Sequence, residues 1–194
     1  MSLVSKIVFL TALLAAPGAS QGRVEGRGDA RRFISQKYMF SMAVPAGWGV
    51  STLLATPVFF YAPPSERFVQ AAIPQGGAAI TTEPHDTVSG QGKSAATPEE
   101  WALADARAFG PNSTPIEPFR MPSESRASRA VICSYDEATF SPDQRKQHSV
   151  AIFWEFNKKL FAAHLNYNAG EPKGPALEKV FLKTIRSLRP LDKH

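Results

Sequence analysis

The chain has a single cysteine, Cys133, among its 194 residues. One cysteine excludes an intramolecular disulfide, so the fold must depend on an apolar core and not on cross-links. A chain of this length with 43% hydrophobic residues can bury one such core. Cys133 alternates with Val131 and Tyr135 on a predicted strand, which favours a buried thiol over a reactive thiolate.

The sequence also lacks the motifs of common catalytic sites. It has no G-x-S-x-G nucleophile elbow. Thr87–Ser94 (TVSGQGKS) resembles a phosphate-binding loop but has Thr87 where the first glycine belongs, and the next helix begins only at Pro98. Asp136 and Glu137 are neighbours on a predicted strand and point to opposite faces, so they cannot form a glycosidase pair. The sequence therefore predicts a protein that is not an enzyme.

Neither sign of charge dominates, and only one long apolar run is present. The net charge of +5 is mildly basic and does not indicate a nucleic-acid partner.

The run Ile7–Ala16 follows Lys6 and precedes small residues. This pattern predicts a signal peptide over residues 1–20, export to the periplasm or the extracellular space, and no transmembrane segment in the mature chain. Residues 21–37 show no apolar periodicity before Phe33 and are predicted to be a flexible basic leader.

Residues 38–190 are predicted to form a single globular domain, followed by a tail at 191–194. Its last two predicted strands form a hairpin with Asn157-Lys158 as the turn, which places Trp154 opposite Phe161. The strands of this hairpin are apolar on both faces, so the sheet must be covered on both sides. The predicted strands are Met39–Val44, Pro57–Ala62, Phe68–Ile73, Gly77–Thr82, Ile116–Met121, Arg129–Glu137, His148–Phe156 and Leu160–Tyr167.

Two predicted helices are available to cover this sheet. Thr97 and Glu100 form a capping box around Pro98, the first helical position. Pro175 begins the second helix, near the end of the chain. The expected fold class is α+β: one antiparallel sheet covered by helices on both faces, an α/β/α sandwich. The expected buried faces are Trp101, Ala104 and Ala108 in the first helix, and Leu177, Val180, Phe181, Thr184, Ile185 and Leu188 in the second.

Four stretches of the chain occur in a distinctive order. They are a Pro-x-Gly-Trp turn at Val44–Trp48, a helix start reading TPEEW at Thr97–Trp101, an aromatic hairpin at Ala151–Tyr167 and a helix end reading IRSLR at Ile185–Arg189. Over roughly Tyr38–Pro190 this order resembles the PsbP-like superfamily. That superfamily comprises α/β/α sandwiches such as the extrinsic photosystem II subunit, a Ran-binding nuclear transport factor and exported bacterial relatives. Most members are binding or assembly modules, so the resemblance implies a binding module here.

Histidines and carboxylates supply a first set of candidate site residues. Glu83, His85 and Asp86 offer ligands to a divalent metal, although they lack the paired spacing of a zinc site. His164 lies on a strand and is expected to be a hydrogen-bonded structural histidine. An unrecognised hydrolase would instead gather His164, Asp136 and an arginine in a cleft.

Cations and aromatic residues supply a second set of candidates. Lys183, Arg186 and Arg189 on the last helix are the candidate contacts to an acidic partner, although a solvated helix face explains them equally well. Four residues are expected to have architectural roles, with Trp48 closing the start of the sheet: Pro45, Trp48, Trp101 and Trp154.

The sequence thus favours a non-catalytic, exported binding or assembly module for a protein or envelope partner, with no cofactor. The alternative is a carrier for a metal or a small molecule, with a pocket beside the aromatic hairpin at Tyr135, Trp154 and Tyr167. An unrecognised hydrolase is the third possibility. Asn112-Ser113-Thr114 is a glycosylation acceptor only if the chain enters a eukaryotic secretory pathway.

Overall fold

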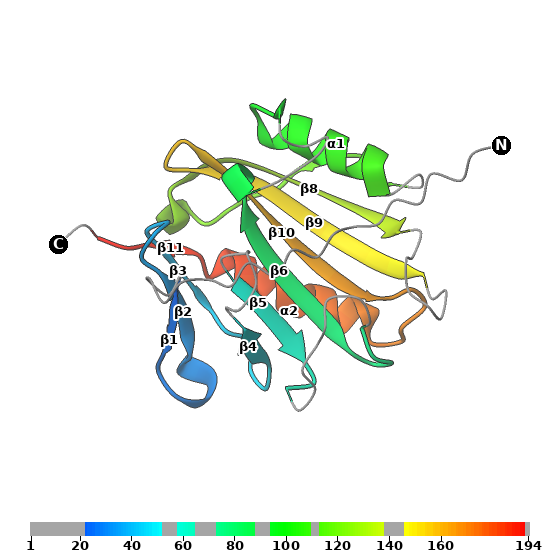
Figure 1. The fold of residues 1–194 in the computed structure, drawn as a ribbon, viewed down its shortest axis with the longest axis horizontal. Helices are drawn as coiled ribbons and strands as arrows, with labels where there is room; N and C mark the ends of the chain where they lie inside the picture. The colour runs from blue at the N-terminus through cyan, green and yellow to red at the C-terminus, as the bar shows by residue number, and fades with distance from the viewer. Residues whose placement is uncertain are drawn as a thin grey trace.

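The computed structural model describes residues 22–51, 58–64, 73–87, 94–109, 113–137 and 146–192 (Figure 1). Several predictions made from the sequence lie outside these ranges. They are the signal peptide at 1–20, all but the last residue of the strand Phe68–Ile73, positions 88–93 of the loop Thr87–Ser94, Asn112, and the last two residues of the tail.

The described strands form two antiparallel sheets. In the seven-stranded sheet the order is β4-β5-β6-β10-β9-β8-β7, and in the four-stranded sheet it is β1-β2-β3-β11. The large sheet contains β4 (Gly49–Ser51), β5 (Val58–Ala62), β6 (Ala78–Pro84), β7 (Glu117–Pro118), β8 (Ala127–Glu137), β9 (Gln147–Phe156) and β10 (Lys159–Asn168). The small sheet contains β1 (Arg23–Glu25), β2 (Arg32–Ser35), β3 (Phe40–Ala43) and β11 (Arg189–Pro190).

The hairpin of β9 and β10 forms the centre of the large sheet, and its predicted register is confirmed. Asn157 and Lys158 both have positive φ, 52° and 60°, as the favoured two-residue turn requires. Trp154 pairs with Phe161 across the strands, and their rings stack with centroids 5.6 Å apart. Local alternation and turn chemistry were therefore sufficient to fix this part of the fold.

The described residues also form two α-helices, α1 (Pro98–Phe109) and α2 (Gly174–Arg186). The cap of α1 is confirmed in part, because the Glu100 amide donates to Thr97 Oγ1 at 3.2 Å and the Glu100 carboxylate accepts from the amide of Ala96 at 2.8 Å. The buried face of α1 differs from the prediction: Trp101, Ala102 and Ala106 are buried, whereas Ala104 is half-buried and Ala108 exposed. Among the described residues, neither helix is long and apolar enough to cross a membrane.

The predicted α/β/α sandwich, with one sheet and helices on both faces, is wrong. One face of the large sheet is covered jointly by the small sheet and α2, which crosses behind the strands in Figure 1. Phe33 of β2 packs edge-on against Phe60 of β5 at 6.4 Å, and Phe40 of β3 packs against Phe161 of β10 at 5.7 Å. On the other face α1 packs on β8 and β9.

The second sheet exists because part of the segment assigned to a flexible leader is strand. In β2, Phe33 and Ser35 are fully buried, while Arg32 and Ile34, which alternate with them, are half-buried, the alternation of a strand with one inner face. The arginine density of residues 21–37 concealed this short pattern in the sequence. Its inner face joins the core that the helices alone were expected to complete.

Pro45 and the three tryptophans assigned architectural roles lie in the interior. Trp48 belongs to the core between the two sheets, where its amide donates to the carbonyl of Pro45 at 3.1 Å. Gly47 makes this turn with a φ of 74°, a conformation that glycine adopts without strain. Trp154 lies in the same core, whereas Trp101 anchors α1 on the opposite face of the large sheet.

Candidate functional site

A group of ionisable side chains lies between α1 and the large sheet. Asp105 of α1 accepts hydrogen bonds from the hydroxyl of Tyr135 on β8 and from His164 on β10, where its Oδ2 is 3.1 Å from Nε2. The other ring nitrogen, Nδ1, is 3.9 Å from Oε1 of Glu83 on β6. His164 thus lies between two carboxylates. We call Glu83, Asp105, Tyr135 and His164 the histidine cluster.

The charges of the histidine cluster are largely compensated within it. Burial, with a contribution from the charge of Asp105, raises the pKa of Glu83 although His164 opposes the shift. Burial also acts to raise the pKa of Asp105, but the charge and hydrogen bond of His164 and the hydrogen bond of Tyr135 outweigh it and lower the pKa. The side chains of His164 and Asp105 are only 12% and 11% exposed. This geometry holds α1 on the sheet and leaves little open surface for a substrate.

The grouping of His164 with Asp136 that the hydrolase alternative required is not formed. Asp136 lies against His148, with Oδ1 2.7 Å from Nδ1, and the carboxylate that bonds to His164 is Asp105. Cys133 is buried, and burial together with the charge of Asp105 raises its pKa to about 12. This thiol is therefore protonated at neutral pH.

The three metal-ligand candidates point to different neighbours. Glu83 faces His164, and the ring of His85 packs edge-on against Trp101 at 4.9 Å. Asp86 accepts from the hydroxyl of Tyr38 at 3.4 Å and lies 3.7 Å from Nζ of Lys159. Across the part of the chain that the structure describes, no group of three or more His, Cys, Asp or Glu side chains is placed to hold a metal.

The pocket proposed beside the aromatic hairpin is not formed by its three predicted residues. Trp154 and Tyr167 are buried in the core between the sheets, whereas Tyr135 is buried on the α1 side. The Tyr167 hydroxyl donates to Glu178 Oε1 at 2.6 Å. These aromatic residues therefore stabilise two different faces of the large sheet and do not enclose a common space.

The predicted cations of the last helix separate into two kinds. Arg189 is half-buried, and its Nη1 donates to the carbonyls of Arg186 at 3.1 Å and Leu188 at 2.7 Å, so it turns back onto the helix end. Lys183 and Arg186 are exposed, as is Lys179 one turn earlier. Within the ranges described, Lys179, Lys183 and Arg186 form no ion pair.

These three cations border a hollow of about 420 Å³ on the outer face of α2, together with Leu182 and Ser187. We call these five residues the α2 groove. Residues 179, 183 and 186 have the spacing i, i+4, i+7, so their side chains form one stripe along the helix. The guanidinium of Arg186 lies over the ring of Phe119, 5.4 Å from its centroid.

Sequence reasoning missed Asp105 and Phe119 as parts of these sites. A signal for Asp105 was present, because it follows Trp101 by four residues and therefore shares its inward stripe. No comparable signal exists for Phe119, whose contact with Arg186 joins residues 67 positions apart in the sequence.

No protein-family description and no curated protein matches the chain. Among the solved structures that resemble it are the following two. PA94 of Pseudomonas aeruginosa, a protein of unknown function, is 12% identical with a TM-score of 0.45, over 89% of this chain and 99% of that chain. The Saccharomyces cerevisiae Ran-binding protein Mog1p is 9% identical with a TM-score of 0.48, over 90% of this chain and 97% of that chain. These values are too low to assign a function or a family, and the resemblance to the PsbP-like superfamily stays a prediction.

Proposed function

We propose that this protein is a non-catalytic binding module that docks a protein partner on the outer face of α2. The observation that carries this proposal is the α2 groove, where three exposed cations border a hollow and have no ion pair within the described residues. Like charges at i, i+4 destabilise a helix by about 0.2–0.5 kcal/mol per pair. A partner that supplies carboxylates would relieve this repulsion and gain charge-assisted hydrogen bonds.

Two features of the opposite face support the non-catalytic part of the proposal. In the histidine cluster, Asp105 and Tyr135 already bond within the protein, and His164 is nearly enclosed. The nearby Cys133 carries a buried, protonated thiol. A general base or nucleophile needs access to a substrate, which this arrangement does not provide.

The compartment and the family are parts of the same proposal. The predicted signal peptide supports export, so the partner is a protein of the cell envelope or the surrounding medium. The order of the Pro-x-Gly-Trp turn, the TPEEW helix start and the aromatic hairpin supports membership of the PsbP-like superfamily.

The test is affinity capture from an envelope extract, using the full chain with a C-terminal tag and crosslinking before lysis. We expect a partner that is displaced by untagged protein and is lost from the double variant Lys183→Glu/Arg186→Glu. The matched control is Arg107→Glu, which reverses an exposed charge on α1. Equal capture by the double variant and by wild type would exclude the α2 groove. Turnover of ester, phosphate or glycoside substrates by the purified protein would contradict the non-catalytic role.

A further inference from the structure

The α2 groove combines an apolar floor with a cationic rim. Leu182 is half-buried and packs against the core between the sheets, so the floor is fixed in position. Lys179, Lys183 and Arg186 stand around it and are exposed. Such a surface suits a ligand that carries an apolar group beside negative charges, since neither chemistry alone would use both parts.

One of the rim cations is held in place before any partner binds. The ring of Phe119 lies under the Arg186 guanidinium, and the Phe119 amide donates to the carbonyl of Ala130 at 2.9 Å, which ties this aromatic to β8. A guanidinium held over an aromatic ring keeps its N–H groups available to a carboxylate. Because the side chain is already ordered, it loses less conformational entropy on binding.

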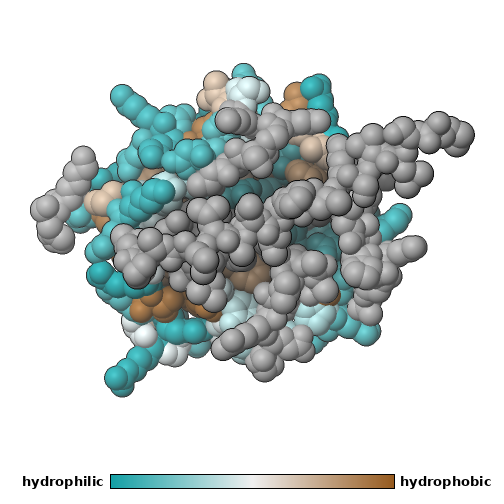
Figure 2. Space-filling view, in the orientation of Figure 1, coloured by the Kyte–Doolittle hydropathy of each residue, from teal (hydrophilic) through white to brown (hydrophobic). Residues whose placement is uncertain are grey.

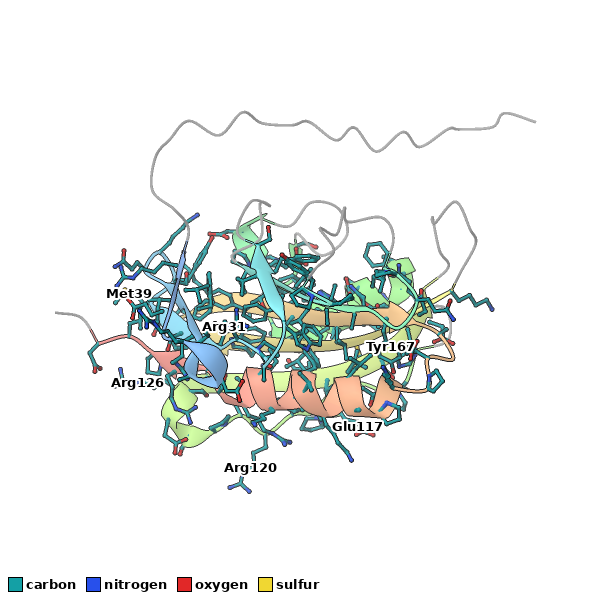
Figure 3. All side chains as sticks on the ribbon, turned by 90° about the horizontal axis from the view of Figure 1, so that it is seen from below. Arg31, Met39, Glu117, Arg120, Arg126 and Tyr167 are labelled. Atoms are coloured by element: carbon teal, nitrogen blue, oxygen red, sulfur yellow. The ribbon has the colours of Figure 1, made fainter. Side chains whose placement is uncertain are left out.

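Glu178 and Asp192 have partners outside the α2 groove. Glu178 accepts from the Tyr167 hydroxyl and, with Glu117, lines a separate hollow beside β8. Asp192 lies 3.9 Å from Arg126. Arg120, next to Phe119, is exposed and extends away from the body of the protein on the side of α2 (Figure 3). The positive charge of the rim is therefore extended by Arg120 and is not cancelled by Glu178 or Asp192.

We infer that the α2 groove takes an acidic segment of a protein partner that places one apolar side chain over Leu182 between carboxylates bound by Lys179, Lys183 and Arg186. This inference rests on the proposed function and names the partner chemistry of the same surface. It differs from a helix-dipole role for the cations, because a dipole role needs neither the hollow nor the contact of Arg186 with Phe119.

A protein segment fits this surface better than an anionic membrane does. Membrane-surface helices insert protruding apolar side chains between the lipids, whereas Leu182 is half-buried and the three cations that line the hollow with it are exposed. In the part of the chain that the structure describes, the exposed large hydrophobic residues are Val24, Leu103 and Phe109, which belong to β1 and α1. Figure 2 presents the opposite side of the molecule from α2, where hydrophobic and hydrophilic colour alternate in the coloured area.

Fluorescence anisotropy with three synthetic peptides and the full chain tests this inference. The first peptide has one leucine flanked on each side by two glutamates, the second replaces the leucine by serine, and the third replaces the glutamates by glutamine. We expect the first to bind, the second to bind about tenfold more weakly because the apolar contact is lost, and the third not to bind. Raising the salt concentration must weaken binding of the first peptide.

Two variants test the contact of Arg186 with Phe119 without reversing a charge. Arg186→Lys preserves the charge but loses the planar donor group over Phe119, and we expect severalfold weaker peptide binding. Phe119→Ala should weaken binding to a similar degree without changing any charge. The matched control for the loss of an aromatic ring is Phe109→Ala, exposed on α1, which should bind as wild type.

Equal binding of the glutamate and glutamine peptides would overturn the inference. Binding to phosphatidylglycerol vesicles in place of the peptides would also overturn it and would assign the groove to a lipid surface. If envelope capture depends on Lys183 and Arg186 but the acidic peptide does not compete, only the partner chemistry is wrong. If capture is insensitive to both residues, the proposed function fails as well.

Discussion

The two sides of the large sheet use charge in opposite ways. Under α1, Asp105 and His164 face each other at 3.1 Å and are nearly enclosed. On α2, Lys179, Lys183 and Arg186 point outward and form no ion pair within the described residues. In the first arrangement the charges are paired within the protein, whereas in the second they face solvent and are open to the proposed partner. A concentration of charged residues thus indicates a binding surface only where the protein leaves the charge uncompensated.

The largest loss of stability is expected when the histidine cluster is broken. Asp105→Ala leaves His164 and Tyr135 without their shared acceptor in a nearly enclosed site. Removing one partner of a buried pair typically destabilises a protein by about 3 kcal/mol or more. Urea unfolding of this variant should show a loss of that size, because α1 loses its polar attachment to the sheet.

Two controls separate this attachment from a general effect of mutating α1. Asp105→Asn keeps an acceptor for Tyr135 and should lose less stability than Asp105→Ala. Arg107→Ala changes an exposed position of the same helix and should stay within about 0.5 kcal/mol of wild type. A wild-type unfolding midpoint for Asp105→Ala would show that the cluster does not hold α1.

A smaller change in stability, of opposite sign, is expected when Glu83 is replaced. Its pKa is raised above the ordinary value of 4.5, so its contribution to stability is full below pH 4.5 and is lost as the pH rises through the folded-state pKa. Glu83→Gln removes this unfavourable charge and should stabilise the protein at pH 7 by about 1 kcal/mol or less. Below pH 4 the variant and wild type should unfold alike.

The pKa of Asp105 is shifted in the opposite direction, and the same pH series tests it. Its pKa is lowered below 3.8, so its contribution is present above pH 3.8 and is lost as the pH falls through the depressed folded-state pKa. The deficit of Asp105→Asn should therefore shrink in acid, whereas the gain of Glu83→Gln should disappear already near pH 4. Thermal unfolding of both variants from pH 3 to pH 7 measures the two trends, and parallel curves would refute the assignment of opposite shifts.

The parts of the fold that the sequence predicted depend on local chemistry. The β9–β10 hairpin follows from alternation and a two-residue turn, and the cap of α1 from residues three apart. Of the parts that were missed, strand β2 is a short local alternation concealed among arginines, whereas the closure of the small sheet depends on distant residues. In the small sheet β3 pairs with β11, which joins Ser41 to Arg189, and no local pattern reports such a pairing.

The residues of the candidate sites were also predictable only where local spacing in the sequence was sufficient. Lys183 and Arg186 were identifiable because helical spacing alone places them on the outer face. Asp105 was missed because its partners, Tyr135 and His164, lie 30 and 59 residues away in the sequence. The role of a carboxylate on the inward face of a helix cannot be identified until the strand residues that donate hydrogen bonds to it are known. This is also why the buried face of α1 was assigned to Ala104 and Ala108.

The smallest expected change in stability comes from a substitution on α2 that separates stability from binding. Lys179→Glu places a carboxylate four residues before Lys183 on α2, the favourable orientation for an i, i+4 pair. We expect a gain in stability of about 0.5 kcal/mol, since a repulsion is replaced by an attraction. The same change removes a rim cation and should weaken capture of the partner. Urea unfolding and affinity capture, run in parallel, measure the two effects. A variant that is more stable and binds as well as wild type would mean that the charge on α2 serves no partner.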